Sequence, residues 1–316
     1  MKIRSSSANE DGLAVPVSFD AGRGDGLGRA LVLGGGGVFF VAWLVAYLKG
    51  LEDRGVDVSS ADVVVGTSAG AMVGAALTTG RLERLARTTR CASRVPGVLG
   101  RLVGSRDPAP SARRAAEMFA AAGDARPETV RAIGLAALAA NGTRPAARSV
   151  GMMMGRPRWA DRDLRITATD CVTGERFVVT RGSGVPLAHA AAASATVPGM
   201  FTPQTVGDRR AMDGGVSGSG THTDLVAGAG RALVLAVSSG VTEPSYTAAP
   251  GDFDREMNAL RESGTQVDVR VARRPEGVGL MDPRAARAGA RIGAQQAAED
   301  IATLAPFWGA GRSPGA

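Results

Sequence analysis

The sequence contains few cysteines, lysines and aromatic residues. Cys91 and Cys171 are too few for a disulfide framework or a four-cysteine metal site, so we expect a reducing compartment. Aromatic residues make up 4% of the chain, which argues against a surface that stacks nucleic-acid bases. Lys2 and Lys49 are the only lysines, so scattered arginines supply nearly all of the cationic charge behind the net +7. We expect no nucleic-acid partner, whereas a peripheral contact with an anionic membrane stays open.

The sequence also lacks an apolar run that would indicate membrane insertion or secretion. Residues 1–28 are polar and predict a flexible leader without a signal peptide, and residues 309–316 predict a tail. Residues 31–48 carry no formal charge and reach the threshold length of a transmembrane helix. Four glycines, Gly34–Gly37, interrupt that stretch and disfavour one continuous helix. A strand, a glycine loop and a helix fit better, and we expect a cytoplasmic protein.

Short apolar runs alternate with helix-length segments from residue 29 onward. This alternation predicts an α/β fold with a mostly parallel sheet, in a single domain over 29–308. Residues 81–158 are rich in Ala and Arg and broken by prolines, which predicts a helical insertion or lid without a clear strand. Strands are expected at 30–33, 63–65, 164–169, 176–180, 232–237 and 267–271, and further helices at 38–51, 69–77, 187–194 and 285–304.

A candidate nucleophile lies between an expected strand and an expected helix. Gly66-Thr67-Ser68-Ala69-Gly70 reads G-x-S-x-G, in which small neighbours permit a tight strand-to-helix turn that exposes the serine. A helix-capping role for Ser68 is the alternative. A second match at 311–315 lacks a preceding strand, and Pro314 removes the backbone N–H after Ser313, so we reject it.

The glycine run and the candidate bases complete the local pattern. Consecutive glycines between a strand and a helix let several N–H groups converge on one oxygen. A dinucleotide loop is disfavoured because Phe39 or Phe40 stands where G-x-G-x-x-G needs its third glycine. Candidate bases are Asp213, which an ordinary turn would also explain, and His222, which could complete a Ser–Asp–His set. His189 lies in an Ala-rich helical segment and is interpreted as a spectator.

Four segments occur in an order that resembles the patatin-like phospholipases. The resemblance spans about residues 29 to 237 and extends more weakly to about residue 300. The segments are LVLGGGGVFFVAWLVAYLKGLEDRGV, VVVGTSAGAMVGAAL, ASATVPGMFTP and AMDGG. Each motif is weak alone, but four in the right order at similar spacing form a specific signal.

This resemblance implies a three-layer α/β/α fold and a Ser–Asp dyad that hydrolyses acyl esters. Ser68 would be the nucleophile and Asp213 the base acting directly on it, which makes His222 a loop residue. The implied supporting residues are the elbow residues Gly66, Thr67, Ala69 and Gly70, the oxyanion donors Gly35, Gly36 and Gly37, the residues Gly214 and Gly215 after the base, and Pro198 in a loop near the site.

The sequence departs from the family pattern beside the glycine run. The family commonly places Arg or Lys and then Gly where Phe39 and Phe40 stand, so charge assistance at that point is in doubt. The rings of Phe39 and Phe40 could line a binding site for an acyl chain, or they could simply pack in the core. The implied function is a lipid acyl ester hydrolase of the phospholipase A or lysophospholipase type, with no cofactor or metal. An acyltransferase or thioesterase on the same dyad, or a non-catalytic lipid-binding or regulatory protein, are the alternatives.

Overall fold

The chain folds around one large mixed sheet. The computed structural model describes residues 19–94, 108–155, 157–238 and 249–309. The strands of the large sheet are β1 (Arg29–Leu33), β2 (Val63–Gly66), β4 (Asp163–Asp170), β5 (Arg176–Val179), β7 (Gln204–Val206), β8 (Arg209–Asp213), β9 (Arg231–Ala236) and β10 (Gln266–Val271). Their order is β10-β9-β1-β2-β4-β8-β7, and β5 also pairs with β4. The first five in this order are parallel, while β5 and β8 run antiparallel to β4.

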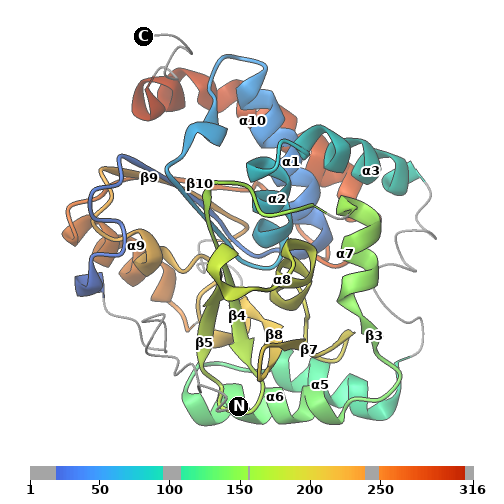
Figure 1. The fold of residues 1–316 in the computed structure, drawn as a ribbon. Helices are drawn as coiled ribbons and strands as arrows, with labels where there is room; N and C mark the ends of the chain where they lie inside the picture. The colour runs from blue at the N-terminus through green and yellow to red at the C-terminus, as the bar shows by residue number, and fades with distance from the viewer. Residues whose placement is uncertain (1–18, 95–107, 156, 239–248, 310–316) are drawn as a thin grey trace.

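Helices cover both faces of this sheet. The α-helices in the described residues are α1 (Gly37–Glu52), α2 (Ala69–Thr78), α3 (Leu82–Arg94), α5 (Pro110–Ala120), α6 (Pro127–Ala139), α7 (Ala146–Met154), α8 (Leu187–Ser194), α9 (Asp252–Glu262) and α10 (Ala285–Trp308). Figure 1 shows α9 on the opposite side of the sheet from α1 and α2. The expected three-layer α/β/α fold is therefore confirmed.

The two apolar layers follow from the alternation of side chains along β1. Leu31 and Leu33 join the core beneath α1, α2, α8 and α10, whereas Ala30 and Val32 join the core beneath α9. All four side chains are fully buried. A strand buried on both faces reads as a continuous apolar run, which explains why β1 and β2 were recognisable from sequence.

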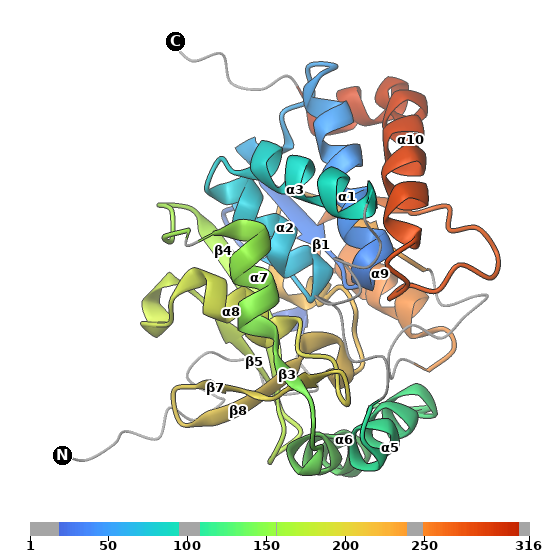
Figure 2. The same ribbon diagram turned by 90° about the vertical axis from the view of Figure 1, so that its right-hand side faces the viewer.

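Helix α10 packs closely along α1. Gly289 and Gly293 place their backbones against the carbonyl groups of Phe39 and Trp43 on α1. Two buried hydrogen bonds cross the same interface, from Trp43 Nε1 to Gln296 Oε1 (2.8 Å) and from the Tyr47 hydroxyl to an oxygen of Asp300 (2.7 Å). Figure 2 shows α10 running beside α1. This contact fixes α1 and therefore the glycine run at its N-terminus.

The insertion differs from the sequence-based expectation in one respect. Helices α3, α5, α6 and α7 lie between residues 81 and 158, but a short strand, β3 (Arg144–Pro145), occurs there and pairs with β6 (Phe201–Thr202). The expectation that no strand appears is wrong, because a two-residue strand has no periodicity to recognise. Helix α9 and the β7–β8 hairpin were also not anticipated. Residues 1–18 of the expected leader and 310–316 of the expected tail lie outside the described residues.

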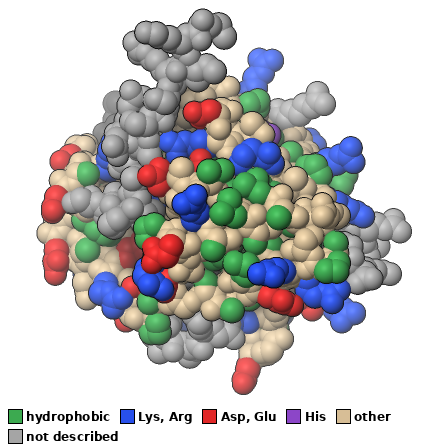
Figure 3. Space-filling view, turned by 90° about the horizontal axis from the view of Figure 1, so that it is seen from below, with side chains coloured by type: hydrophobic (Ala, Val, Ile, Leu, Met, Phe, Trp, Pro, Cys, Tyr) green, Lys and Arg blue, Asp and Glu red, His purple; other side chains and the backbone are tan. Residues whose placement is uncertain are grey.

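The α5–α6 hairpin (residues 110–139) covers the carboxyl end of the sheet. A Cβ added at Gly199 would lie 2.2 Å from the Ala112 carbonyl oxygen, and one at Gly134 would lie 2.2 Å from that of Cys171, which follows β4. The hairpin thus touches loops at the edge where the parallel strands end. Figure 3 views this side of the molecule, where hydrophobic side chains are interspersed with both basic and acidic ones.

No residue larger than glycine should be tolerated at position 293 of α10 without a loss of stability. A Cβ there would lie 2.4 Å from the Trp43 carbonyl oxygen, so we expect Gly293→Ala to lower the free energy of unfolding by roughly 1–3 kcal/mol. The matched control is Gly151→Ala in α7, where a Cβ meets no atom within 4 Å. Helix propensity predicts a gain of roughly 0.5–1 kcal/mol for that control. Denaturant titration measures both, and equal effects would contradict the packing argument.

Candidate active site

Ser68 lies on a strained turn between β2 and α2. Its φ of 53° is in the left-handed region, which residues other than glycine seldom adopt. Gly66 and Gly70 make this turn sterically feasible. A Cβ on Gly66 would lie 2.8 Å from the Ala71 Cα, and one on Gly70 would lie 1.9 Å from the Leu33 carbonyl oxygen. The Ser68 side chain makes no capping hydrogen bond to α2, which argues against the helix-cap interpretation.

Hydrogen bonds connect this turn to β4, β1 and α8. The Thr67 hydroxyl lies 2.8 Å from that of Thr167 on β4, and the Thr67 N–H donates to the Leu33 carbonyl. The Ser68 N–H donates to Oγ of Ser194, the last residue of α8, at 2.8 Å. The role of Ser194 was missed from sequence, although it belongs to the family-like segment that contains Pro198. Its position depends on tertiary packing and leaves no local signal.

Asp213 ends β8 and is fully buried. Its N–H donates to the Thr196 carbonyl at 2.9 Å, so the loop after α8 touches the residues on either side of the candidate site. The carboxyl Oδ1 accepts the N–H of Gly215 at 2.9 Å. Gly214 lies so close to β4 that a Cβ would approach Thr167 Oγ1 to 2.4 Å. Glycine is therefore sterically required at position 214, where the turn passes beside the neighbouring strand.

The environment of Asp213 favours its neutral form. Burial raises the pKa of the carboxyl from 3.8 to about 7, and hydrogen bonds from the Ser68 side chain and the Gly215 N–H oppose this rise. Ser68 is thus one of the two groups that favour the ionised carboxylate. Even so, Oδ2 has no partner of regular hydrogen-bond geometry in the described part of the chain. Oδ1 of the Asp213 carboxyl is therefore held by the Gly215 N–H, whereas Oδ2 can still accept a hydrogen bond.

The glycine run contributes fewer free donors than the resemblance implies. The Gly35 N–H donates to the Gly220 carbonyl at 2.9 Å and is engaged in this structure. The N–H groups of Gly36 and Gly37 have no acceptor among the described residues. Gly37 has a φ of 61°, and a Cβ there would lie 2.5 Å from Met281 Sδ. Gly34 connects the run to the Ser68 turn, because its carbonyl accepts the Gly70 N–H at 3.1 Å.

The two aromatic rings after the run belong to the core. Phe39 and Phe40 are fully buried, and Phe40 stacks on Trp43 with ring centroids 5.4 Å apart. Of the two interpretations that the sequence left open, simple packing agrees with this structure.

Both histidines have partners outside the candidate Ser–Asp pair. The His222 ring contacts the Arg176 guanidinium and the Gly214 carbonyl, at 2.7 and 3.0 Å. Burial and the neighbouring Arg176 lower the His222 pKa to about 3. The His189 Nε2 lies 2.7 Å from the Thr205 carbonyl oxygen. Neither arrangement is that of a base acting on Ser68.

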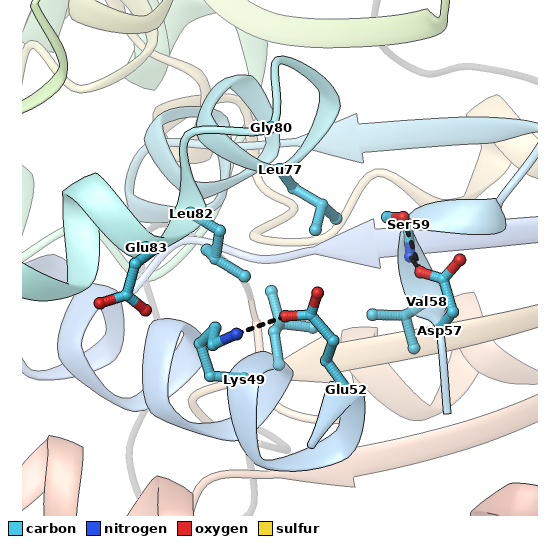
Figure 4. A pocket seen from close by; sticks show the side chains of 10 residues that line it. Lys49, Glu52, Asp57, Val58, Ser59, Leu77, Gly80, Leu82 and Glu83 are labelled. Atoms are coloured by element: carbon cyan, nitrogen blue, oxygen red, sulfur yellow. Dashed lines mark hydrogen bonds and ion pairs between the residues drawn. The ribbon is translucent and has the colours of Figure 1, made fainter. Parts of the chain in front are cut away.

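A separate pocket lies at the C-terminal ends of α1 and α2. Its volume is about 160 Å³, and its lining includes the ion pair of Lys49 with Glu52 as well as Glu83 (Figure 4). None of the candidate site residues lines it. Within the described ranges, no cluster of three or more His, Cys, Asp or Glu residues could hold a metal ion. No helix in these ranges is long and apolar enough to cross a membrane.

Comparisons with known proteins relate the chain to one family. The family described as "Patatin-like phospholipase" matches residues 31–225, well over half of the chain. Among solved structures, VipD from Legionella pneumophila is 12% identical with a TM-score of 0.32, covering 67% of this chain and 50% of VipD. The type III effector protein ExoU is 20% identical with a TM-score of 0.30, covering 85% and 53%. The chain thus spans about half the length of these two proteins. No curated protein matches.

The buried Asp213 should make stability depend on pH. The folded-state pKa of about 7 lies above the ordinary 3.8, so its contribution to stability is full below pH 3.8 and is lost as the pH rises through 7. We expect Asp213→Asn, which keeps the acceptor for Gly215, to be more stable than wild type at pH 8 but not at pH 4. Denaturant titrations at the two pH values measure this, and an equal difference at both would contradict the raised pKa.

Proposed function

The chain belongs to the patatin-like phospholipase family, and we propose that it hydrolyses acyl esters of lipids with Ser68 as nucleophile and Asp213 as base. One observation carries the proposal. The strained Ser68 lies beside a buried carboxyl that has an available oxygen and a pKa near 7. A base with a pKa near the working pH combines a useful deprotonated fraction with sufficient basicity.

The proposed reaction has two halves. Asp213 accepts the proton of the Ser68 hydroxyl while Oγ forms a bond to the acyl carbonyl carbon. The tetrahedral intermediate collapses, the bond to the leaving alkoxide breaks, and Asp213 returns the proton to that oxygen. Asp213 then accepts a proton from a water molecule whose oxygen attacks the acyl-enzyme carbonyl. The second tetrahedral intermediate collapses, the bond from the acyl carbon to Ser68 Oγ breaks, and Asp213 returns the proton to Oγ, which releases a fatty acid and regenerates Ser68 and the carboxylate.

The developing oxyanion would be held by the glycine run and not by a charged side chain. Gly36 and Gly37 lie at the N-terminus of α1 with N–H groups that no described residue accepts, and the helix dipole adds positive potential there. Gly35 could contribute only if its bond to Gly220 breaks. We therefore assign Gly36 and Gly37 as the principal donors.

The side that carries the α5–α6 hairpin is suited to a peripheral contact with anionic lipid. Leu135 on α6 and Val172 after β4 are each 47% exposed, and they flank the close contact between Gly134 and Cys171. Arg131, one turn before Leu135 on α6, is exposed as well. Apolar and cationic side chains together favour binding at a lipid interface.

Hydrolysis should depend on both members of the proposed pair. With p-nitrophenyl esters, we expect Ser68→Ala to abolish turnover. We expect Asp213→Asn to lower kcat by about 10²–10⁴, because it removes the base while keeping the shape. Ser313→Ala, in the second G-x-S-x-G match, is the control and should behave as wild type. Full activity of Ser68→Ala would overturn the assignment.

Vesicle binding tests the lipid contact separately. We expect the protein to cosediment with phosphatidylserine-containing vesicles at low salt and to be released at high salt. Leu135→Glu should weaken cosedimentation, whereas Met152→Glu on α7, where Met152 is 63% exposed, should have a smaller effect. No binding at low salt, or equal effects of the two changes, would contradict this surface.

A further inference from the structure

A buried charged cluster lies behind the turn that follows Asp213. Arg176 on β5 forms two hydrogen bonds with the Asp224 carboxylate, each 2.7 Å long. The two side chains are only 3% and 8% exposed. The bidentate geometry fixes the guanidinium plane and directs one of its nitrogens at His222.

This contact determines where His222 carries its proton. Arg176 Nη1 lies 2.7 Å from His222 Nδ1, and a guanidinium can only donate. Nδ1 must therefore accept, which requires a neutral ring with its proton on Nε2. The low pKa of the buried ring agrees with this state. Nε2–H then donates to the Gly214 carbonyl oxygen at 3.0 Å.

The Gly214 carbonyl belongs to the same peptide group as the Gly215 N–H. That group accepts a hydrogen bond from His222 at its oxygen and donates one to Asp213 Oδ1 at its nitrogen. An acceptor bond at the oxygen polarises the amide and strengthens the bond that its N–H donates. We propose that His222 is a positioning residue that, through this single peptide group, fixes Asp213 Oδ1 and leaves Oδ2, which has no partner in the described part of the chain, for the Ser68 hydroxyl. The inference rests on the proposed function of Asp213 as the base.

The chain holds His222 in this place at a conformational cost. Its φ of 54° is in the left-handed region. Glu256 on α9 secures the loop on both sides, since its carboxylate accepts hydrogen bonds from the hydroxyls of Ser219, Thr221 and Thr223. The strained backbone of His222, and the contacts of its ring to Arg176 and to the turn after Asp213, indicate that His222 does more than connect two parts of a loop.

Two other donors share the Gly214 oxygen. The hydroxyl of Ser217 lies 2.9 Å from it and that of Thr169 lies 3.4 Å from it. Loss of His222 alone should therefore weaken the turn without abolishing it. An effect of roughly tenfold on kcat corresponds to one such hydrogen bond.

Nitrogen-15 NMR of the imidazoles tests the tautomer directly in the wild-type protein. The sequence has only two histidines, so a His189→Gln variant assigns the signals. We expect the His222 ring to be neutral with its proton on Nε2 at pH 7. A proton on Nδ1, or a charged ring, would overturn the proposal whether or not the protein is an esterase.

Two substitutions at His222 distinguish the effect of its side-chain hydrogen bond from the effect of its backbone conformation. The side-chain amide introduced by His222→Gln can place an N–H near the position of Nε2, whereas the shorter side chain introduced by His222→Asn reaches only the position of Nδ1. Asn is the better residue for left-handed backbone. If backbone conformation alone mattered, His222→Asn would therefore be the more active of the two.

We expect His222→Gln to keep kcat within a few fold of wild type. His222→Asn and His222→Ala should lose roughly tenfold in kcat with little change in KM. Ser68-dependent turnover that is equal in all His222 variants, or higher in His222→Asn than in His222→Gln, overturns the positioning role alone. Absence of Ser68-dependent turnover in the wild type overturns the proposed function, and the catalytic part of this inference with it.

Discussion

The close approach of the α2 N-terminus to the end of β1 is the constraint on which the site depends. The Gly70 N–H donates to the Gly34 carbonyl, and the Thr67 N–H donates to the Leu33 carbonyl. No side chain fits at Gly70, because a Cβ would lie 1.9 Å from the Leu33 carbonyl oxygen. This contact joins the Ser68 turn to the glycine run, so that the strained serine and the proposed oxyanion donors belong to one rigid unit.

The second constraint is a buried carboxyl whose described neighbours include no cation in contact with it. Desolvation alone would keep Asp213 protonated at neutral pH, whereas the Gly215 N–H and the Ser68 side chain favour the charged form. Arg176, a buried cation on β5, is instead bound to Asp224 and His222. An arginine directly on Asp213 would lower its pKa and weaken it as a base. Arg176 thus neutralises the charge of Asp224, while Asp213 keeps the raised pKa that suits the proposed proton transfer.

Much of the fold and part of the site could be predicted from sequence. Apolar runs and glycine punctuation indicated β1, β2, α1 and α2, because these elements are largely buried and carry strong local patterns. The G-x-S-x-G pattern gave Ser68 as the candidate nucleophile, and the family resemblance then made Asp213 the candidate base. Contacts between distant segments were not predictable. The bond of Gly35 to Gly220, the bond of Ser68 to Ser194 and the Arg176–Asp224 pair all arise from tertiary packing and have no periodicity.

The most direct test of this account is to locate a fluorophosphonate adduct by peptide mass mapping in wild type and in Asp213→Asn. A fluorophosphonate reacts only with an activated serine, so the adduct reports the nucleophile and its base together. The account predicts one adduct, on Ser68, that forms far more slowly in Asp213→Asn. An adduct on another serine, or a rate on Ser68 that does not change when Asp213 is replaced, would contradict it.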